Sequence, residues 1–307
     1  MRILVTGGAG FIGSNLASQL VSAGHEVVVA DDFSSAHWSN LVGFRGEVLT
    51  VDVAGDVSSL RGRNPFEVIF HQASITDTTV LDQRKMMLNN VEGFRNILKL
   101  AQEWKSRVIW AGSASVYGRG KAPNRESAAP GPLNVYGYSK LAMERLAEQY
   151  NEKLSRPAIG LRYFNVYGPS EDHKGKFASM IHQLAKQMRA GKRPRVFTAG
   201  EQRRDFVYID DVVRANINAI KSTQGGVFNV GSGKSWTFNE VVAELNRALK
   251  TNLAPEYFDN PYSFTQDRTE ADLTESRRGL GYEPKFDLAR GIDAYLASGK
   301  LGNQSCQ

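Results

Sequence analysis

The amino-acid sequence predicts an α/β fold in which helices cover both faces of a doubly wound parallel sheet, followed by a smaller mixed α/β part. Three observations lead to this prediction. Short apolar, β-branched runs alternate with segments of helical periodicity over the first half of the 307 residues. A glycine-rich turn directly follows the first run, and an acidic pair ends the second. After about residue 165 the alternation loosens into loops rich in glycine and proline.

The expected strands are runs short enough to be buried in a parallel sheet. They cover Arg2–Thr6, Glu26–Ala30, Val48–Val51, Glu67–His71, Arg107–Ala111 and Ala158–Phe164. The helical segments between them cover Phe11–Ala23, Asn89–Glu103 and Tyr138–Lys153. Later helices are expected at Phe177–Ala190, Asp210–Ile220 and Phe238–Leu249, with isolated strands such as Val227–Val230. We therefore expect one domain over residues 1–165 and a smaller one over residues 166–307, with some segments of the second returning to the first.

The composition argues against several classes of protein. No run of eighteen apolar residues occurs and the first apolar segment lacks a signal-peptide layout, so we expect a cytoplasmic protein without a membrane partner. The net charge of +6 is spread along the chain without a basic tail, which argues against a nucleic-acid partner. The single cysteine, Cys306, excludes a disulfide framework, and no cluster of ligands has metal-site spacing.

One stretch departs from this even distribution of charge. Between residues 186 and 204 the chain has a single acidic residue, Glu201, among seven basic ones. The basic residues are Lys186, Arg189, Lys192, Arg193, Arg195, Arg203 and Arg204. The stretch is either a solvated helix and polar loop or a cradle for a small polyanion.

The glycine-rich turn predicts a dinucleotide site of the Rossmann type. Gly7 and Gly10 fall where the first strand must turn sharply, and Gly13 lies where a side chain would hold the helix away from the sheet. The helix then begins at Phe11 and Ile12, where unpaired N–H groups and the positive end of the helix dipole favour a pyrophosphate.

The acidic pair that ends the second strand bears on the choice of dinucleotide. Asp31 lies eighteen residues after Gly13, where a carboxylate accepts hydrogen bonds from an adenosine ribose. A 2′-phosphate would meet both Asp31 and Asp32, and the following FSSAHWSN has no Lys or Arg to neutralise it. The pair favours NAD over NADP.

Three residues form a candidate catalytic set. Tyr136 and Lys140 lie one helical turn apart, and Ser113 follows the strand Arg107–Ala111 at the carboxyl edge of the sheet, where ligands of open α/β folds bind. We expect a nearby Lys140 ammonium and a cationic nicotinamide to favour the Tyr136 phenolate. Tyr136 would then remove a hydroxyl proton while Ser113 hydrogen-bonds the same oxygen and Lys140 steadies the ribose.

These motifs, in their order and spacing, resemble a known family. TGGAGFIG, GSASVYG and YGYSK are similar to the extended short-chain dehydrogenases/reductases of the NAD-dependent epimerase/dehydratase family, which act on nucleotide sugars. FHQASITDTT, MMLNNV, RYFNVYGP, HKGK, RRDFVYIDDV and TEADL most resemble its ADP-L-glycero-D-manno-heptose 6-epimerases, with the UDP-hexose 4-epimerases next. The resemblance implies a Rossmann fold, a tightly held NAD and a nucleotide-diphosphate sugar as substrate.

The resemblance also implies roles for further residues. Those lining the cofactor would be Gln72, Ala73, Ser74 and Asn89. Those binding the substrate would be Ser113, Asn165 and Arg204 at the oxygen and phosphates, and Phe197 and Tyr262 around the base. Lys174 would be a second acid/base on the far side of the substrate; without the resemblance it reads as a flexible loop lysine. The helices at residues 89–100 and 138–150 would form the seam of a homodimer.

Departures from related patterns narrow the reaction. Sugar-nucleotide dehydratases carry an Asp-Glu pair where this chain has Ala114 and Ser115, so elimination of water is not expected. A lysine and a histidine of the heptose pattern appear as Trp38 and Gln183. Epimerisation through a keto-sugar therefore leads, with a net dehydrogenase or reductase and a non-catalytic dinucleotide-sensing protein as alternatives. His71 is expected to be structural.

Overall fold

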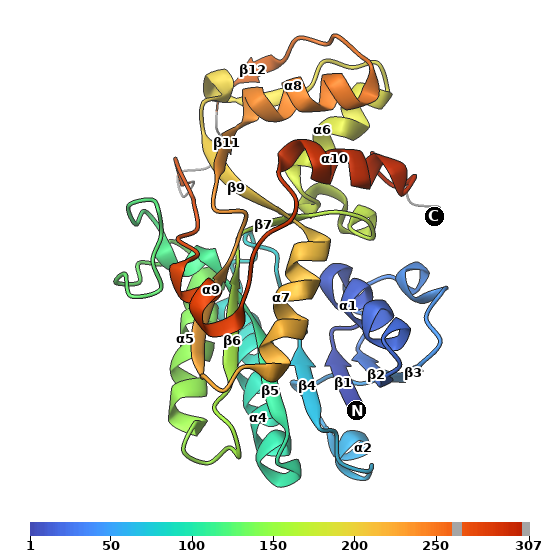
Figure 1. Cartoon of the computed structure of the whole chain (residues 1–307), viewed down its shortest axis with the longest axis vertical. Coiled ribbons are helices and arrows are strands. Elements are labelled where there is room, and N and C mark those ends of the chain that lie inside the picture. The colour runs from blue at the N-terminus through green and yellow to red at the C-terminus, as the bar shows by residue number, and fades with distance from the viewer. Residues whose placement is uncertain (260–265, 303–307) are drawn as a thin grey trace.

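The computed structural model describes residues 1–259 and 266–302, and its centre is a seven-stranded parallel sheet (Figure 1). The strand order is β10-β6-β5-β4-β1-β2-β3. The strands are β1 (Arg2–Thr6), β2 (Glu26–Asp31), β3 (Glu47–Thr50), β4 (Val68–His71), β5 (Arg107–Ser113), β6 (Ile159–Tyr163) and β10 (Gly226–Val230). Every pair in this sheet is parallel, so all seven carboxyl ends lie at one edge. The predicted doubly wound sheet is confirmed.

Helices cover both faces of this sheet, because alternate strand residues point to opposite sides. Ile3 and Val5 pack in the core under α1 (Phe11–Ser22) and α7 (Ile209–Lys221). Leu4 packs in the core on the other face, under α4 (Gly93–Trp104) and α5 (Val135–Tyr150). Helix α4 is preceded by α3 (Gln83–Met87) and one π-helical turn, Leu88–Glu92. The short helix α2 (Ser58–Arg61) completes this part.

The second part of the chain is built on two small sheets that lie beyond the carboxyl edge of the first (Figure 1). One contains β7 (Asn165–Tyr167), β9 (Arg203–Tyr208) and β11 (Ser235–Thr237); the other contains β8 (Arg195–Phe197) and β12 (Glu256–Phe258). The helices are α6 (Met180–Arg189), α8 (Phe238–Leu249), α9 (Thr274–Leu280) and α10 (Leu288–Ala297). Helices α6, α8 and α10 pack together around the smaller sheets. None of the helices in the described ranges is long and apolar enough to cross a bilayer.

One predicted strand lies elsewhere than expected. We predicted an isolated strand at Val227–Val230, but β10 pairs in parallel with β6 and forms an edge of the main sheet. Helix α7 also returns to this sheet and packs on β5 and β6. Both segments carry buried apolar side chains, such as Phe228 and Val212, that the sheet and its neighbours cover. The expected boundary at residue 165 stays a prediction.

A buried ion pair joins the main sheet to the helix that carries Tyr136. Arg162 of β6 donates to both carboxylate oxygens of Glu144 in α5, at 2.8 and 2.7 Å, and the side chains are 5% and 6% exposed. Arg162 also donates to the Tyr117 hydroxyl at 2.9 Å and to the Glu126 carbonyl at 3.2 Å. These bonds satisfy a charge that would otherwise be costly to bury.

Candidate active site

The glycine turn between β1 and α1 has no room for side chains at two positions. Gly7 has a φ of +67°, and a Cβ there would lie 2.5 Å from the Ala73 nitrogen. A Cβ on Gly13 would lie 2.1 Å from the Gly7 carbonyl oxygen. Gly10 is the N-cap of α1, so the free N–H groups of Phe11 and Ile12 follow it directly. The turn is a cradle that fits a pyrophosphate.

Asp31 does more than the sequence predicted. It is only 6% exposed, and its two oxygens accept hydrogen bonds from the backbone N–H groups of Ala9 and Phe33, both at 2.9 Å. Burial raises the pKa of Asp31, and the two backbone donors act against this rise. Asp31 therefore fixes the glycine turn. Asp32 is exposed beside it and accepts from the Ser34 N–H and hydroxyl.

Asn40 connects the glycine turn to the second part of the chain, which the sequence analysis missed. Its Nδ2 donates to the Ala9 carbonyl at 2.9 Å and lies 3.2 Å from Nδ1 of His173. Asn40 belongs to a 3₁₀ turn, Trp38–Leu41, in which Trp38 is exposed. Asn15 of α1 makes a similar link, because its Nδ2 donates to the Pro169 carbonyl at 2.9 Å.

The structure brings the three candidate catalytic residues together. Ser113 is the last residue of β5, and Tyr136 lies in the first turn of α5, which Asn134 caps by accepting from the Gly137 N–H. The Ser113 hydroxyl lies near enough to the Tyr136 hydroxyl to lower its pKa. Lys140 Nζ lies 5.8 Å from the centre of the Tyr136 ring.

Burial acts on the pKa values of both Tyr136 and Lys140. Burial raises the pKa of Tyr136, and the nearby Ser113 hydroxyl only partly offsets this rise. Lys140 is buried and donates to Ser74 Oγ at 2.5 Å and to the Ala111 carbonyl at 2.9 Å, and burial lowers its pKa to about 7. Burial therefore acts against both charged forms. The expectation that Lys140 and a cationic nicotinamide together favour the phenolate stays a prediction.

The residues expected to line the cofactor from β4 onwards differ in their contacts. Ser74 receives the Lys140 hydrogen bond, and the Ala73 backbone packs against Gly7. Gln72 instead contacts Asn216 and the Tyr163 hydroxyl, both at 3.2 Å. Asn89 is partly exposed, with no hydrogen bond from its side chain to the described residues.

Asn90, next to Asn89, was missed by the sequence analysis. Its side chain holds the loop after β4 against α5. Its Oδ1 accepts from the Ile75 N–H at 2.8 Å, and its Nδ2 donates to Ser139 Oγ at 2.9 Å. Asn90 is fully buried within the π-helical turn. The pair of asparagines in MMLNNV was a signal, but the sequence did not show which one faces inward.

His71 lies beneath the site and is fully buried. Its Nδ1 lies 2.8 Å from the Thr6 hydroxyl, its ring stacks on Phe94, and its Nε2 has no hydrogen-bond partner among the described residues. Burial, together with the charge of Lys140, lowers the pKa of His71 to about 3. No group of His, Cys, Asp and Glu side chains in the described ranges is arranged to hold a metal ion.

His71 should make the fold sensitive to acid. The unfolded state binds a proton near pH 6.5 and the folded state only near pH 3, so stability is lost as the pH falls through this window. Between pH 6.5 and 5 we expect a loss of about 1.5–2 kcal/mol from this residue. Urea unfolding of His71→Asn, which keeps a partner for Thr6, should show a correspondingly weaker pH dependence. His25→Asn is the control, and an unchanged slope in His71→Asn would contradict the assignment.

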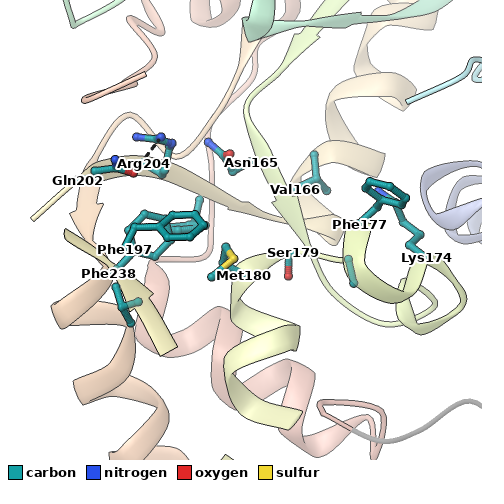
Figure 2. Close-up of a pocket in the computed structure, with 13 residues that line it drawn as sticks. Asn165, Val166, Lys174, Phe177, Ser179, Met180, Phe197, Gln202, Arg204 and Phe238 are labelled. Atoms are coloured by element: carbon teal, nitrogen blue, oxygen red, sulfur yellow. Dashed lines mark hydrogen bonds between the residues drawn. The ribbon is translucent and has the colours of Figure 1, made fainter. Parts of the chain in front are cut away.

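A cavity of about 330 Å³ opens between the small sheets and α6 (Figure 2). Four of the predicted substrate residues line it: Asn165, Lys174, Phe197 and Arg204. Phe177, Ser179, Met180, Gln202 and Phe238 complete most of its wall. Tyr262 lies outside the described residues, so its role stays a prediction.

Arg204 is the one member of the basic stretch that lines this cavity. Its guanidinium donates to the carbonyls of Arg203 and Asp267, at 2.9 and 3.3 Å, and forms no ion pair within the described ranges. Burial lowers its pKa to about 10, so it keeps its charge at neutral pH. Other basic residues of the stretch contact groups outside the cavity. Arg195, for example, forms an ion pair with Glu256. Arg204 is therefore the residue of this stretch for which the polyanion reading stays a prediction.

Lys174 is partly exposed at the cavity wall. It lies in a 3₁₀ segment, Asp172–Phe177, and its Nζ is 5.8 Å from the centre of the Phe11 ring at the start of α1. Burial lowers the pKa of Lys174, while the negative charge of Glu171 acts in the opposite direction. Gln183, at the expected histidine position, donates to the carbonyls of Lys176 and Ala178 and so supports this segment.

Comparison with known proteins agrees with this geometry. Residues 3–231 match the family model described as the NAD dependent epimerase/dehydratase family. The chain is 38% identical to an ADP-L-glycero-D-manno-heptose-6-epimerase of Brachyspira hyodysenteriae, over 95% of this chain and 96% of that one. It is similar to the crystal structure of the Helicobacter pylori ADP-L-glycero-D-manno-heptose-6-epimerase, with 42% identity, a TM-score of 0.91 and coverage of 97% and 95%. A UDP-glucose 4-epimerase of Thermotoga maritima with UDP-glucose has 30% identity, a TM-score of 0.89 and coverage of 97% and 98%.

Proposed function

Since the chain belongs to the NAD-dependent epimerase/dehydratase family, we propose that it is a nucleotide-sugar epimerase that inverts C6 of an ADP-glycero-manno-heptose through a keto-sugar. The observation that carries the proposal is the position of Ser113, Tyr136 and Lys140. They converge at the carboxyl edge of the sheet, where the glycine turn also lies.

The cofactor site fits NAD on three grounds. The glycine turn excludes a Cβ at Gly7 and Gly13 and so admits a pyrophosphate, and Asp31 and Asp32 stand where a 2′-phosphate would be repelled. Ser74 and Lys140 complete the site beside the turn. Bound NAD supplies a group that accepts a hydride from the carbinol carbon and later returns it.

The protein's own residues handle the proton. Tyr136 takes the proton of the substrate hydroxyl as the carbonyl forms and gives it back when the alcohol is restored. Ser113 donates a hydrogen bond to the same oxygen, and the Lys140 side chain lowers the cost of the buried phenolate when it is charged. Since the carbonyl carbon is planar, return of the hydride to its other face inverts the centre.

The cavity supplies the substrate contacts in this proposal. Arg204 neutralises the diphosphate, Asn165 hydrogen-bonds it, and Phe197 stacks near the base. Lys174 lies on the side of the cavity that faces α1 and acts as the second acid/base from there. These assignments rest on the position of each side chain and on the resemblance to the heptose epimerases.

A UDP-hexose 4-epimerase is the second candidate, favoured by the 30% identity and full-length match to the Thermotoga maritima enzyme. We favour the ADP-heptose substrate because the heptose epimerases reach 38% and 42% identity to this chain.

We also propose a homodimer formed through α4 and α5. Large apolar side chains near this face, including Leu88 and Tyr138, are 43% and 47% exposed.

Proton NMR of the purified protein with each sugar nucleotide tests the proposal. We expect inversion at C6 of the ADP-heptose without accumulation of NADH, and a kcat/KM roughly 100-fold above that for UDP-glucose. Inversion at C4 of UDP-glucose would favour the second candidate. Stoichiometric NADH would indicate a net dehydrogenase, and bound NAD without any turnover would indicate a sensing protein.

A further inference from the structure

The segment that carries Lys174 is held at both ends by one buried side chain. Glu171 precedes the segment and is 0% exposed. Its Oε1 accepts from the Gly168 N–H at 3.1 Å and the Ser179 hydroxyl at 2.9 Å, and its Oε2 accepts from the Ser179 N–H at 2.5 Å. Ser179 is the N-cap of α6, so Glu171 joins the end of β7 to the start of that helix.

Further bonds reduce the freedom of the residues between these ends. The Lys174 N–H donates to the Glu171 carbonyl at 3.0 Å, and the Ala178 N–H donates to the Gly175 carbonyl at 3.2 Å. Gln183 holds the far side through the Ala178 carbonyl at 2.7 Å. Residues 172–178 are therefore a loop whose shape depends on Glu171.

Glu171 also supplies charge. No Lys or Arg lies within ion-pair distance of it in the described ranges, yet its carboxyl and the Lys174 ammonium each act on the other. Burial raises the pKa of Glu171, and the N–H donors and Lys174 act against that rise. The carboxylate accepts backbone hydrogen bonds that favour its ionised form. The buried Glu171 carboxylate therefore supplies negative charge that acts on Lys174 at the cavity wall.

Other titratable groups surround this pair. Tyr295 of α10 lies near enough to Glu171 for the two groups to affect each other's protonation, and its hydroxyl lies 2.8 Å from His182 Nδ1. The remaining groups are Tyr167 on β7, Tyr208 on β9, Asp172, His173 and Lys176 on the loop, Lys186 on α6, and Asp287 and Lys300 near the C-terminus. Among them, Glu171 is the carboxyl group that acts directly on Lys174.

We propose that Glu171 is a positioning residue for Lys174: its buried carboxylate fixes the 172–178 loop and supplies a negative charge to the surroundings of the Lys174 side chain. The proposal rests on the role given to Lys174 in the proposed function. It adds a residue that does not line the cavity and acts only through one that does.

Trace acetylation of the NAD-loaded protein with acetic anhydride, followed over pH by mass spectrometry, tests the proposal at Lys174 itself. Glu171→Gln keeps the size of the side chain and removes its charge, so the pH at which Lys174 is half-reactive should fall by about one unit or more. The basic limb of the kcat profile should move to lower pH by a similar amount. Asp172→Asn removes an equal charge from the next residue and should leave the Lys174 midpoint within a few tenths of a unit.

Two further variants distinguish the effect of the Glu171 charge from the effect of its hydrogen bonds to the loop. Ser179→Ala removes a hydrogen bond to Glu171 but keeps its charge, and should also leave the midpoint in place. If Glu171→Gln fails to fold, Lys174→Met gives the reciprocal measurement, because ¹³C NMR of labelled glutamate should then show Glu171 titrating at higher pH. A Lys174 midpoint that is the same in the wild type and Glu171→Gln would overturn the proposal, as would an unmoved Glu171 in Lys174→Met. The acetylation and ¹³C NMR readouts do not use turnover, so absence of epimerisation would count against the proposed function alone.

Discussion

Replacing Tyr136 with phenylalanine is expected to lower kcat for epimerisation by about 10²- to 10⁴-fold, because the variant lacks the oxygen that exchanges the proton. The ring and its place in the first turn of α5 are kept, so NAD binding should not change. Initial rates from the NMR assay give kcat, and the absorbance of cofactor released by denaturation gives the NAD content. Both measurements use the same purified protein.

Tyr138→Phe is the matched control for this change. Tyr138 lies two residues further along the same helix and is 47% exposed, on the face proposed for the homodimer rather than beside Ser113 and Lys140. Its kcat should stay within about twofold of the wild type, since surface changes away from the site have little effect. A Tyr136→Phe enzyme that retained a tenth or more of the wild-type rate would remove Tyr136 from the role of base.

Glu144→Gln is expected to lower the free energy of unfolding by about 3–5 kcal/mol. The change leaves the buried Arg162 guanidinium without its ion-pair partner, while its bonds to the Tyr117 hydroxyl and the Glu126 carbonyl are bonds to neutral groups. This is a large part of the stability of a typical domain. Chemical denaturation, followed by circular dichroism, measures the loss.

The same helix provides the control for this prediction. Glu148 lies one turn beyond Glu144 and is exposed, with no ion pair within the described ranges. Glu148→Gln should change the stability by less than about 0.5 kcal/mol. Equal effects of the two substitutions would show that burial of the Arg162–Glu144 pair does not matter. Since α5 also carries Tyr136 and Lys140, the Glu144 variant should lose bound NAD at lower denaturant concentrations.

The main sheet could be predicted because its strands are continuous apolar runs, a pattern that a strand buried on both faces produces. All six predicted strands of the first part occur, with ends shifted by only a few residues. The strands β7, β8, β11 and β12 were missed because each has three residues, too few to establish a period. The place of β10 was missed for another reason: its partner β6 lies more than sixty residues away, and local pattern carries no information on pairing.

The catalytic set could be predicted because parallel strands end at one edge, which brings Ser113 close to the start of the following helix. Side chains that support this set could not. Asn40, Asn90 and Glu171 act through hydrogen bonds between segments distant in the sequence. The direction of the Tyr136 pKa was also out of reach, because it depends on how deeply the fold buries the phenol.

The contacts of the Asn40 amide bear on the binding and release of the dinucleotide and of the sugar nucleotide. It spans from the Ala9 carbonyl, in the turn that cradles the pyrophosphate, to His173, the neighbour of Lys174. A dinucleotide seated on the glycine turn would lie beside this link, whereas a sugar nucleotide at the Phe197 and Arg204 end of the cavity would lie away from it. An isomerase that regenerates its hydride carrier in every cycle has no need to exchange it. The link that Asn40 makes between the two loops suits a dinucleotide that stays bound while successive sugar nucleotides bind and leave.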